Sequence, residues 1–179
     1  MKKYKVGIIG NRFVGESTAY AFSPVADIRI YDIDPLRSSH SLEDVCECDF
    51  VFIAVPTPMK KDGSQDVSYI EKVFAKVTPG PVYIIKSTIL PGTTNNLISK
   101  YNNLNIIFSP EFLTERTAKL DMLTQARVVF GGNHEVCNKV TNLYKQRFMK
   151  RNFIITDPTT AEYIKYMNNT FFATKVSIM

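Results

Sequence analysis

Cysteine is scarce in this sequence, and long apolar runs and blocks of positive charge are absent. The three cysteines, Cys46, Cys48 and Cys137, are an odd number and form no CxxC pair. That pattern argues against a disulfide framework or a zinc site, so we expect no metal and a reducing, cytoplasmic compartment. No apolar run approaches the ~18 residues of a membrane helix, so we expect no membrane association. The apolar run after the basic start turns into a polar loop at Gly10, which is too early for a signal peptide.

The composition is that of a globular protein. Hydrophobic residues make up 45% of the 179 residues, enough for a packed core in one domain or one domain with a short extension. A formal charge of +5 is modest and suits small phosphorylated ligands as well as nucleic acid. The loose basic stretch from Lys145 to Arg151 is interpreted as the solvated end of a surface helix, so no nucleic-acid partner is expected.

Short apolar runs alternate with amphipathic stretches along the chain. The runs lack polar alternation, which is typical of strands buried on both faces. Strand–helix repetition predicts an α/β fold, a Rossmann-like, doubly wound, mainly parallel sheet with helices on both faces. The expected strands are residues 5–9, 27–31, 50–55, 82–86, 105–108, 127–130 and 153–155. The expected helices are residues 14–22, 67–77, 93–101, 114–123 and 134–149.

The end of the chain has a different pattern. Residues 159–179 contain no Gly or Pro and are predicted as one long helix, capped by Asp157 or Thr159 with Pro158 in its first turn. The sequence stops inside this helix, which is typical of a cut chain. We therefore expect a Rossmann-like domain over residues 1–157 and the truncated start of a long helix over residues 158–179.

A glycine-containing turn follows the first expected strand. Gly10 permits the tight bend and Gly15 lets the helix pack on the strand, so a pyrophosphate can sit over the helix N-terminus. Arg12 stands where the middle glycine of such turns lets the backbone approach the ligand. Its guanidinium could pair with phosphate, but the loss of space is close to the ligand. We expect weakened binding, and tighter NAD binding in Arg12→Gly.

The second expected strand ends at Asp32, some twenty residues beyond the turn. A carboxylate there accepts hydrogen bonds from a ribose 2′-hydroxyl and repels a 2′-phosphate, which favours NAD over NADP. Arg37 is the counter-argument, because an arginine near that position can hold the extra phosphate. A solvated loop acid is the alternative interpretation of Asp32.

Four later segments resemble the UDP-glucose and GDP-mannose dehydrogenase family. They are IAVPTP at residues 53–58 with DVSY at 66–69, KSTILPGT from Lys86, SPEFLTE at 109–115 with Asp121 and Arg127 beyond it, and AEYIKYMNNTFFATK at 161–175. Together with the turn they cover nearly the whole chain in order. The last segment resembles the start of the family's long central helix between two domains.

The resemblance implies a four-electron oxidation. A sugar alcohol gives a hydride to NAD, a cysteine thiolate captures the aldehyde, and a second hydride transfer and hydrolysis release the uronate. Lys165 and Asn169 would stabilise the oxyanion, while Glu115 and Thr88 would position or activate the water. The implied NAD site consists of Gly10, Arg12, Phe13, Val14, Gly15, Asp32, Arg37, Val55, Pro56, Thr57, Ser87, Thr88 and Glu115. The implied sugar-nucleotide site consists of Phe112, Leu113, Glu115, Lys165 and Asn169.

Several of these residues also have an ordinary structural interpretation. Thr57 and Thr88 follow buried strands at the carboxyl edge of the sheet, where hydroxyls can bind ligand or cap turns. Lys165 and Asn169 are four residues apart and share a helical face, and a donor aimed at an oxyanion is worth ~3–4 kcal/mol. Without the resemblance, Lys165 is interpreted as a surface lysine, and Glu115 as an exposed acid.

The sequence also departs from the family's pattern. The family's nucleophilic cysteine lies in a later, Gly-rich segment, and none of the three cysteines here matches it. The stretch between Asp32 and Asp49 is shorter than in typical members, so a shrunken or absent second helix and third strand are expected. Arg116 and the pair Gln125 and Ala126 replace common family residues, which bears on substrate preference.

Three functions compete. The leading one is the NAD-binding portion of a nucleotide-sugar 6-dehydrogenase that oxidises UDP-glucose or a related UDP- or GDP-sugar and is inactive on its own. The second is a degenerate nucleotide-binding or interaction module, and the third is another NAD enzyme such as a hydroxyacid dehydrogenase. The final helix would expose Tyr166, Phe171, Phe172 and Val176, so a homodimer through this helix is expected.

Overall fold

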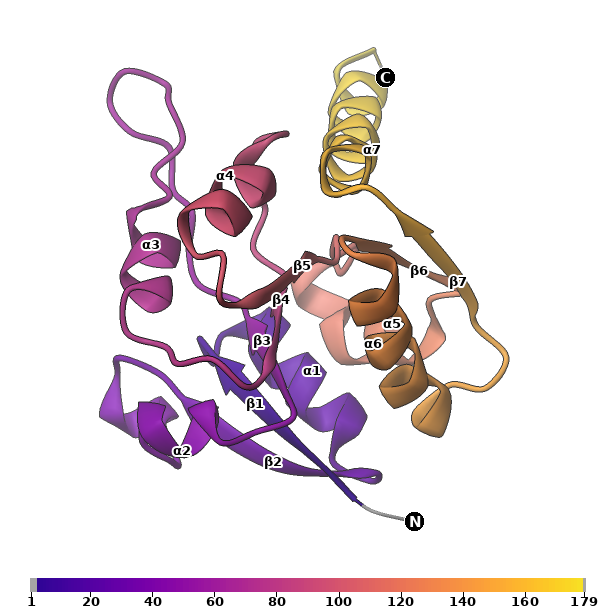
Figure 1. Ribbon diagram of the computed structural model, residues 1–179. Helices are drawn as coiled ribbons and strands as arrows, with labels where there is room; N and C mark the ends of the chain where they lie inside the picture. The colour runs from indigo at the N-terminus through magenta and orange to yellow at the C-terminus, as the bar shows by residue number, and fades with distance from the viewer. Residues whose placement is uncertain (1–2, 179) are drawn as a thin grey trace.

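The computed structural model describes residues 3–178, and Met179 of the expected last helix lies outside this range. Seven strands form one sheet in the order β2-β1-β3-β4-β5-β6-β7 (Figure 1). The strands are β1 (Tyr4–Ile9), β2 (Ala26–Tyr31), β3 (Phe50–Ile53), β4 (Val82–Ile85), β5 (Asn105–Phe108), β6 (Arg127–Gly131) and β7 (Asn152–Thr156). Every expected strand is therefore present, with ends that differ by one or two residues.

The sheet is mainly parallel, as expected. The first five strands in the order, β2 to β5, pair in parallel. Strand β6 runs antiparallel to β5 through the single pair Phe108 and Gly131, and β7 is parallel to β6. The carboxyl ends of β1 to β5 therefore share one edge, where ligands bind in open α/β sheets. The expected α/β, Rossmann-like fold is confirmed.

Helices cover both faces of the sheet (Figure 1). One face packs against α1, α5 and α6, and the other against α2, α3, α4 and the start of α7. The helices are α1 (Phe13–Phe22), α2 (Leu42–Cys46), α3 (Ser68–Phe74), α4 (Thr93–Lys100), α5 (Ala118–Thr124), α6 (His134–Arg147) and α7 (Pro158–Ile178), with 3-10 turns η1 (Pro35–Arg37) and η2 (Glu115–Thr117).

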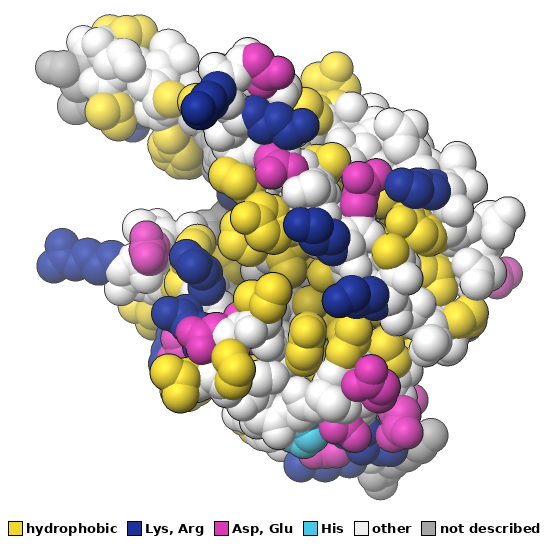
Figure 2. Space-filling view, turned by 90° about the vertical axis from the view of Figure 1, so that its left-hand side faces the viewer, with side chains coloured by type: hydrophobic (Ala, Val, Ile, Leu, Met, Phe, Trp, Pro, Cys, Tyr) yellow, Lys and Arg dark blue, Asp and Glu magenta, His cyan; other side chains and the backbone are white. Residues whose placement is uncertain are grey.

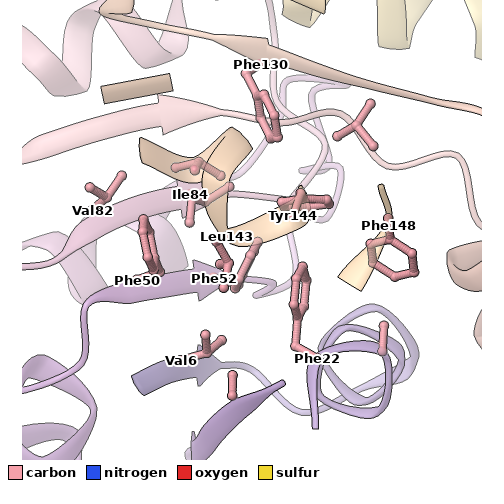
Figure 3. Packing of buried hydrophobic residues seen from close by; sticks show 14 of the residues in the cluster. Val6, Phe22, Phe50, Phe52, Val82, Ile84, Phe130, Leu143, Tyr144 and Phe148 are labelled. Carbon is pink, nitrogen blue, oxygen red and sulfur yellow. The ribbon is translucent and has the colours of Figure 1, made fainter. Parts of the chain in front are cut away.

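Aromatic side chains fill the core between the sheet and α6. The Tyr144 ring of α6 packs edge-on against Phe22 and Phe130, with ring centroids 4.9 and 5.3 Å apart (Figure 3). Phe22 in turn stacks on Phe52 of β3 at 5.6 Å. Aromatic pairs of this geometry add stability beyond the area they bury, and they fix α1 and α6 against the same strands.

Two expected helices differ from the structure. The helix expected over 114–123 begins as the 3-10 turn η2 and becomes α-helical only at Ala118. The Asp121 carboxylate causes this start, because it accepts from the Thr114 amide at 2.8 Å and the Thr117 hydroxyl at 2.9 Å. The helix expected over 67–77 ends at Phe74, shortly before Pro79 and Gly80.

The stretch between Asp32 and Asp49 is compact. It holds η1 and the five-residue helix α2, whose Ser41 and Asp44 form a reciprocal capping box. Strand β2 is consequently an edge of the sheet.

The start of α7 is anchored, while its end is exposed. Asp157 caps the helix by accepting from the Thr160 amide at 2.9 Å. The buried Glu162 carboxylate accepts from the Gly92 amide at 2.6 Å and the Thr94 amide at 2.8 Å, at the N-terminus of α4. Beyond Asn168 the described side chains of α7 are exposed. Within residues 3–178, no helix combines the length and apolar character needed to span a bilayer.

Candidate functional site

The turn between β1 and α1 requires glycine at two positions. Gly10 has a φ of +92°, and a Cβ there would lie 2.6 Å from the Ala54 carbonyl oxygen. A Cβ on Gly15 would overlap the carbonyl oxygen of Gly10. Gly10 therefore makes the bend and Gly15 the close packing of helix on strand, the two glycine roles of a dinucleotide-binding turn.

Arg12 is the N-cap residue of α1. Its backbone is extended, with φ −95° and ψ −166°, so this position does not need glycine for its conformation. The first helical hydrogen bond runs from the Glu16 amide to the Arg12 carbonyl at 2.8 Å. The amides of residues 13–15 precede that bond and have no partner inside the helix, which makes the helix start suitable for an anion.

Asp32 lies directly after β2, beside the turn. Its carboxylate oxygens accept from the Asn11 amide at 2.6 Å and the Asp34 amide at 3.0 Å. Each oxygen keeps a second lone pair, so the carboxylate is oriented but can still accept ribose hydroxyls. The Arg37 Nε atom lies 3.4 Å from Asp34 Oδ2, so its charge already faces a carboxylate.

A cavity of about 470 Å³, here called the Asp32 cavity, opens at this edge of the sheet. On the face shown in Figure 2, Lys and Arg side chains surround an apolar hollow. The Asp32 cavity is lined by Ile9, Gly10, Arg12, Tyr31, Asp32, Ile33, Asp34, Arg37, Leu42, Ala54, Val55, Pro56, Tyr69, Lys72, Val73 and Lys76.

A second cavity of about 290 Å³, here called the Lys165 cavity, adjoins it. Its lining consists of Arg12, Phe13, Val14, Ala54, Val55, Pro56, Thr57, Lys86, Ser87, Thr88, Glu111, Leu113 and Lys165. Arg12 and residues 54–56 line both cavities. An elongated ligand that fills both must therefore cross at Arg12, over the start of α1, so the residues present fit a dinucleotide with its diphosphate at that crossing.

Three expected hydroxyl residues lie at the edge of the Lys165 cavity. The Thr57 hydroxyl donates to the Thr88 carbonyl at 2.6 Å, and the Ser87 hydroxyl donates to the Val55 carbonyl at 2.7 Å. These bonds tie the loops after β3 and β4 together. Thr57 thus has the structural function that the sequence left open, and Ser87 has a similar one, with both hydroxyl oxygens still able to accept one bond.

A buried ion pair lies at the floor of the Lys165 cavity. Lys86 Nζ is 2.8 Å from Glu111 Oε2, and the two side chains are only 1% and 5% exposed. The Lys165 ammonium donates to the Glu111 carbonyl and lies 5.4 Å from the centre of the Phe112 ring. Glu111 therefore connects Lys86, which directly follows β4, with Lys165 of α7.

Burial and charge act in opposite directions on the two lysines. Burial alone would lower the pKa of Lys86, but the facing Glu111 carboxylate outweighs it and raises the pKa above the usual lysine value. Burial lowers the pKa of Lys165, and the nearby Lys86 charge lowers it further against the opposing pull of Glu111. Of the two lysines, Lys165 is therefore the one that loses its proton more readily.

Two expected catalytic residues lie apart from this cluster. Glu115 is exposed on η2, in a surface hollow with Glu16 and Lys119 that borders the Lys165 cavity at Phe13 but has no lining residue in common with the Asp32 cavity. Asn169 is exposed on α7, one turn beyond Lys165. The structure brings Lys165 together with Leu113 and Thr88, but it does not bring Glu115 or Asn169 to them.

Sequence analysis missed Lys86 and Glu111. They lie inside the segments KSTILPGT and SPEFLTE: Lys86 is the last residue of the strand expected over 82–86, and Glu111 lies three residues after the strand expected over 105–108, at the ligand-binding edge of the sheet. An ionisable residue at the end of an apolar run was the available signal.

The cysteines lie elsewhere. Within residues 3–178, none of the three lines either cavity. Cys48 and Cys137 are buried, and burial raises the pKa of each thiol to about 11. No three His, Cys, Asp or Glu side chains of the described residues gather as metal ligands.

Comparisons with known proteins agree on one family. The model of the UDP-glucose/GDP-mannose dehydrogenase family, NAD binding domain, matches residues 30–148. A UDP-glucose 6-dehydrogenase of Rickettsia conorii is 35% identical over 139 residues, which covers 73% of this chain and 32% of that protein. A putative UDP-glucose 6-dehydrogenase of Bacillus subtilis is 36% identical over 157 residues, which covers 79% and 36%.

Solved structures of dehydrogenases share the fold of this chain. A UDP-glucose dehydrogenase from Pyrobaculum islandicum superimposes with a TM-score of 0.89 at 25% identity, over 99% of this chain and 51% of that one. A GDP-mannose dehydrogenase from Pseudomonas aeruginosa shares the fold, with a TM-score of 0.84 at 23% identity, over 97% and 51%. The chain thus spans about a third of the curated relatives' length and about half of the solved chains.

Proposed function

The chain belongs to the UDP-glucose/GDP-mannose dehydrogenase family, with NAD as the cofactor of the matched domain, and we propose that it holds NAD for the oxidation of a nucleotide sugar to its uronate. The observation that carries this proposal is the pair of cavities that meet at Arg12, between the glycine turn and Asp32. Bound NAD supplies the hydride acceptor, and the chain's own residues supply orientation and charge.

The Asp32 cavity is assigned the adenosine half. Its carboxylate, held by two backbone amides, accepts the ribose hydroxyls and disfavours a 2′-phosphate. Arg37, which faces Asp34, is less available for such a phosphate. The N-terminus of α1 receives the diphosphate, and the Lys165 cavity then receives the nicotinamide half and the reacting carbon of the sugar.

The Lys165 ammonium is assigned the alkoxide oxygen that would form when the sugar alcohol loses its proton, before its hydride leaves. An ammonium aimed at that oxygen stabilises it in proportion to how well it is held in place. Glu111 lines the Lys165 cavity, and Glu115 does not. Glu111 is therefore the better candidate to orient a water at this site, with Thr88 beside it, while Asn169 and Glu115 need a change of position to take part.

We expect this 179-residue chain by itself to bind NAD without completing the reaction, because none of its cysteines borders the Lys165 cavity. The sugar is UDP-glucose or a related UDP- or GDP-sugar. Isothermal titration with NAD, NADP and UDP-glucose, with NADH formation followed by absorbance, tests this. NAD binding without turnover is expected. Turnover by this chain, or no affinity for NAD, would refute the proposal, and the latter result would favour a degenerate module.

A homodimer through α7 is part of the proposal. Met167, Phe171, Phe172 and Val176 are 67%, 63%, 54% and 76% exposed, whereas Tyr166, expected among them, is half-buried. Exposed apolar side chains in this number on one helix favour association. Sedimentation equilibrium should show a dimer at tens of micromolar, which Phe171→Ser with Phe172→Ser should convert to a monomer. A monomeric parent protein would exclude this interface.

A further inference from the structure

Positive charge predominates in the Lys165 cavity. Three cations, Arg12, Lys86 and Lys165, and one carboxylate, Glu111, line it, which gives a formal charge of +2. Lys86 and Glu111 are buried and compensate each other at 2.8 Å. Arg12 stands at the crossing between the cavities, the place assigned to the diphosphate that NAD and NADH have in common. Lys86, Glu111 and Lys165 together therefore keep one positive charge, and Lys165 is the lysine of the three that forms no ion pair with Glu111.

The surroundings of Lys165 strengthen its field. The ammonium is partly buried, and its hydrogen bond goes to a neutral acceptor, the Glu111 carbonyl. No carboxylate among residues 3–178 forms an ion pair with it. Because partly buried charges are screened less than exposed ones, a second charge in this cavity interacts strongly with Lys165.

The nicotinamide of NAD exists in two charge states. The oxidised ring is a cation, and gaining a hydride, two electrons with one proton, makes it neutral. We infer that the Lys165 cavity discriminates between these states, with Lys165 as the residue that disfavours oxidised NAD and retains NADH. This inference rests on the proposed function, which assigns the nicotinamide half to this cavity.

Tighter binding of NADH favours oxidation of the alcohol. A site that binds NADH more tightly than NAD raises the reduction potential of the bound cofactor, so the ring accepts a hydride from an alcohol more readily. A tenfold preference corresponds to about 30 mV for a two-electron couple. The same preference slows release of NADH, so the site would respond to the ratio of the two forms.

Binding constants for NAD, NADH and ADP-ribose test the inference on the chain itself. ADP-ribose lacks the nicotinamide and reports the adenosine and diphosphate contacts alone. We expect NADH to bind about tenfold more tightly than NAD, because repulsion between the Lys165 ammonium and a positively charged ring in the same cavity has an effect of that order. Lys165→Met should reduce the preference to about threefold or less while leaving ADP-ribose affinity unchanged.

Two further variants separate charge from damage to the fold. Lys119→Met removes an exposed cation that lies outside both cavities and should leave the preference intact. Lys61→Met removes a second exposed cation that lies outside both cavities, so the preference should also persist. Equal affinities for NAD and NADH in the parent chain, or an unchanged preference in Lys165→Met, would overturn the inference. If ADP-ribose and both dinucleotides fail to bind, the proposed function fails as well.

Discussion

The buried ion pair between Lys86 and Glu111 makes a quantitative prediction about stability. At 2.8 Å the Coulomb attraction is about 6 kcal/mol for an effective dielectric constant of 20. Most of it is offset by the cost of burying both charges, so replacing the whole pair with neutral groups should be close to neutral. Removing one partner is different, because it leaves a charge without a counterion at 1% or 5% side-chain exposure.

We therefore expect Lys86→Met to lower the free energy of unfolding by about 3 kcal/mol, the lower end for a broken buried pair, since Glu111 also borders a cavity. Glu111→Gln should cost a similar amount. The double variant should lie within about 1 kcal/mol of the parent, a coupling that urea denaturation followed by circular dichroism can measure. If the single variants were as stable as the parent, or if the double variant lost the sum of both single losses in free energy of unfolding, the two charges would not form a coupled buried pair.

The pH dependence of this contribution has a defined sign. Because the pKa of Lys86 is raised in the folded state, the stabilisation is fully present below the unfolded lysine pKa of about 10.4. It is lost only as the pH rises through the folded-state pKa of Lys86. The stability difference between parent and Lys86→Met should therefore be the same at pH 7 and pH 9.

Three further variants probe the cofactor site and the final helix. Arg12→Gly should tighten NAD binding several-fold, because the arginine stem stands at the crossing of the cavities; weaker binding would identify the guanidinium as a ligand. Asp32→Ser should raise the affinity for NADP relative to NAD in calorimetry, and an unchanged ratio would argue against the ribose contact. Glu162→Gln weakens the hydrogen bonds from the Gly92 and Thr94 amides, so thermal unfolding should show a free energy of unfolding lower by about 2 kcal/mol. A loss below about 0.5 kcal/mol would show that α7 packs on the sheet without these bonds.

The sequence allowed the strands and their burial to be predicted, because uninterrupted apolar runs such as 82–85 have few other uses in a globular protein. It did not predict that β6 reverses against β5. That reversal depends on how α5 returns the chain to the sheet edge, and hydrophobic patterns carry no strand direction. The short helix α2 and the missing outer strand followed from segment length alone.

The glycine turn and Asp32 were accessible to sequence analysis because each depends on local backbone geometry. The presence of Glu111 beside Lys165 was not accessible in this way. Residues 110–114 form an irregular loop, so helical spacing gives no information on whether Glu111 or Glu115 points into the site. The choice depends on Lys86, which lies 25 positions earlier, directly after β4, and attracts the Glu111 carboxylate inward by its charge.

The central claim is that one NAD molecule occupies both cavities and crosses between them at Arg12. Backbone amide resonances of the isotope-labelled chain, recorded during titration with NAD, test this most directly. The amides of Asp32 and Tyr69 in the Asp32 cavity, Val55 at the crossing and Thr88 in the Lys165 cavity should all shift along one saturation curve, while that of Arg116 should not. Shifts confined to one cavity, or centred on the surface hollow at Glu115, would contradict it.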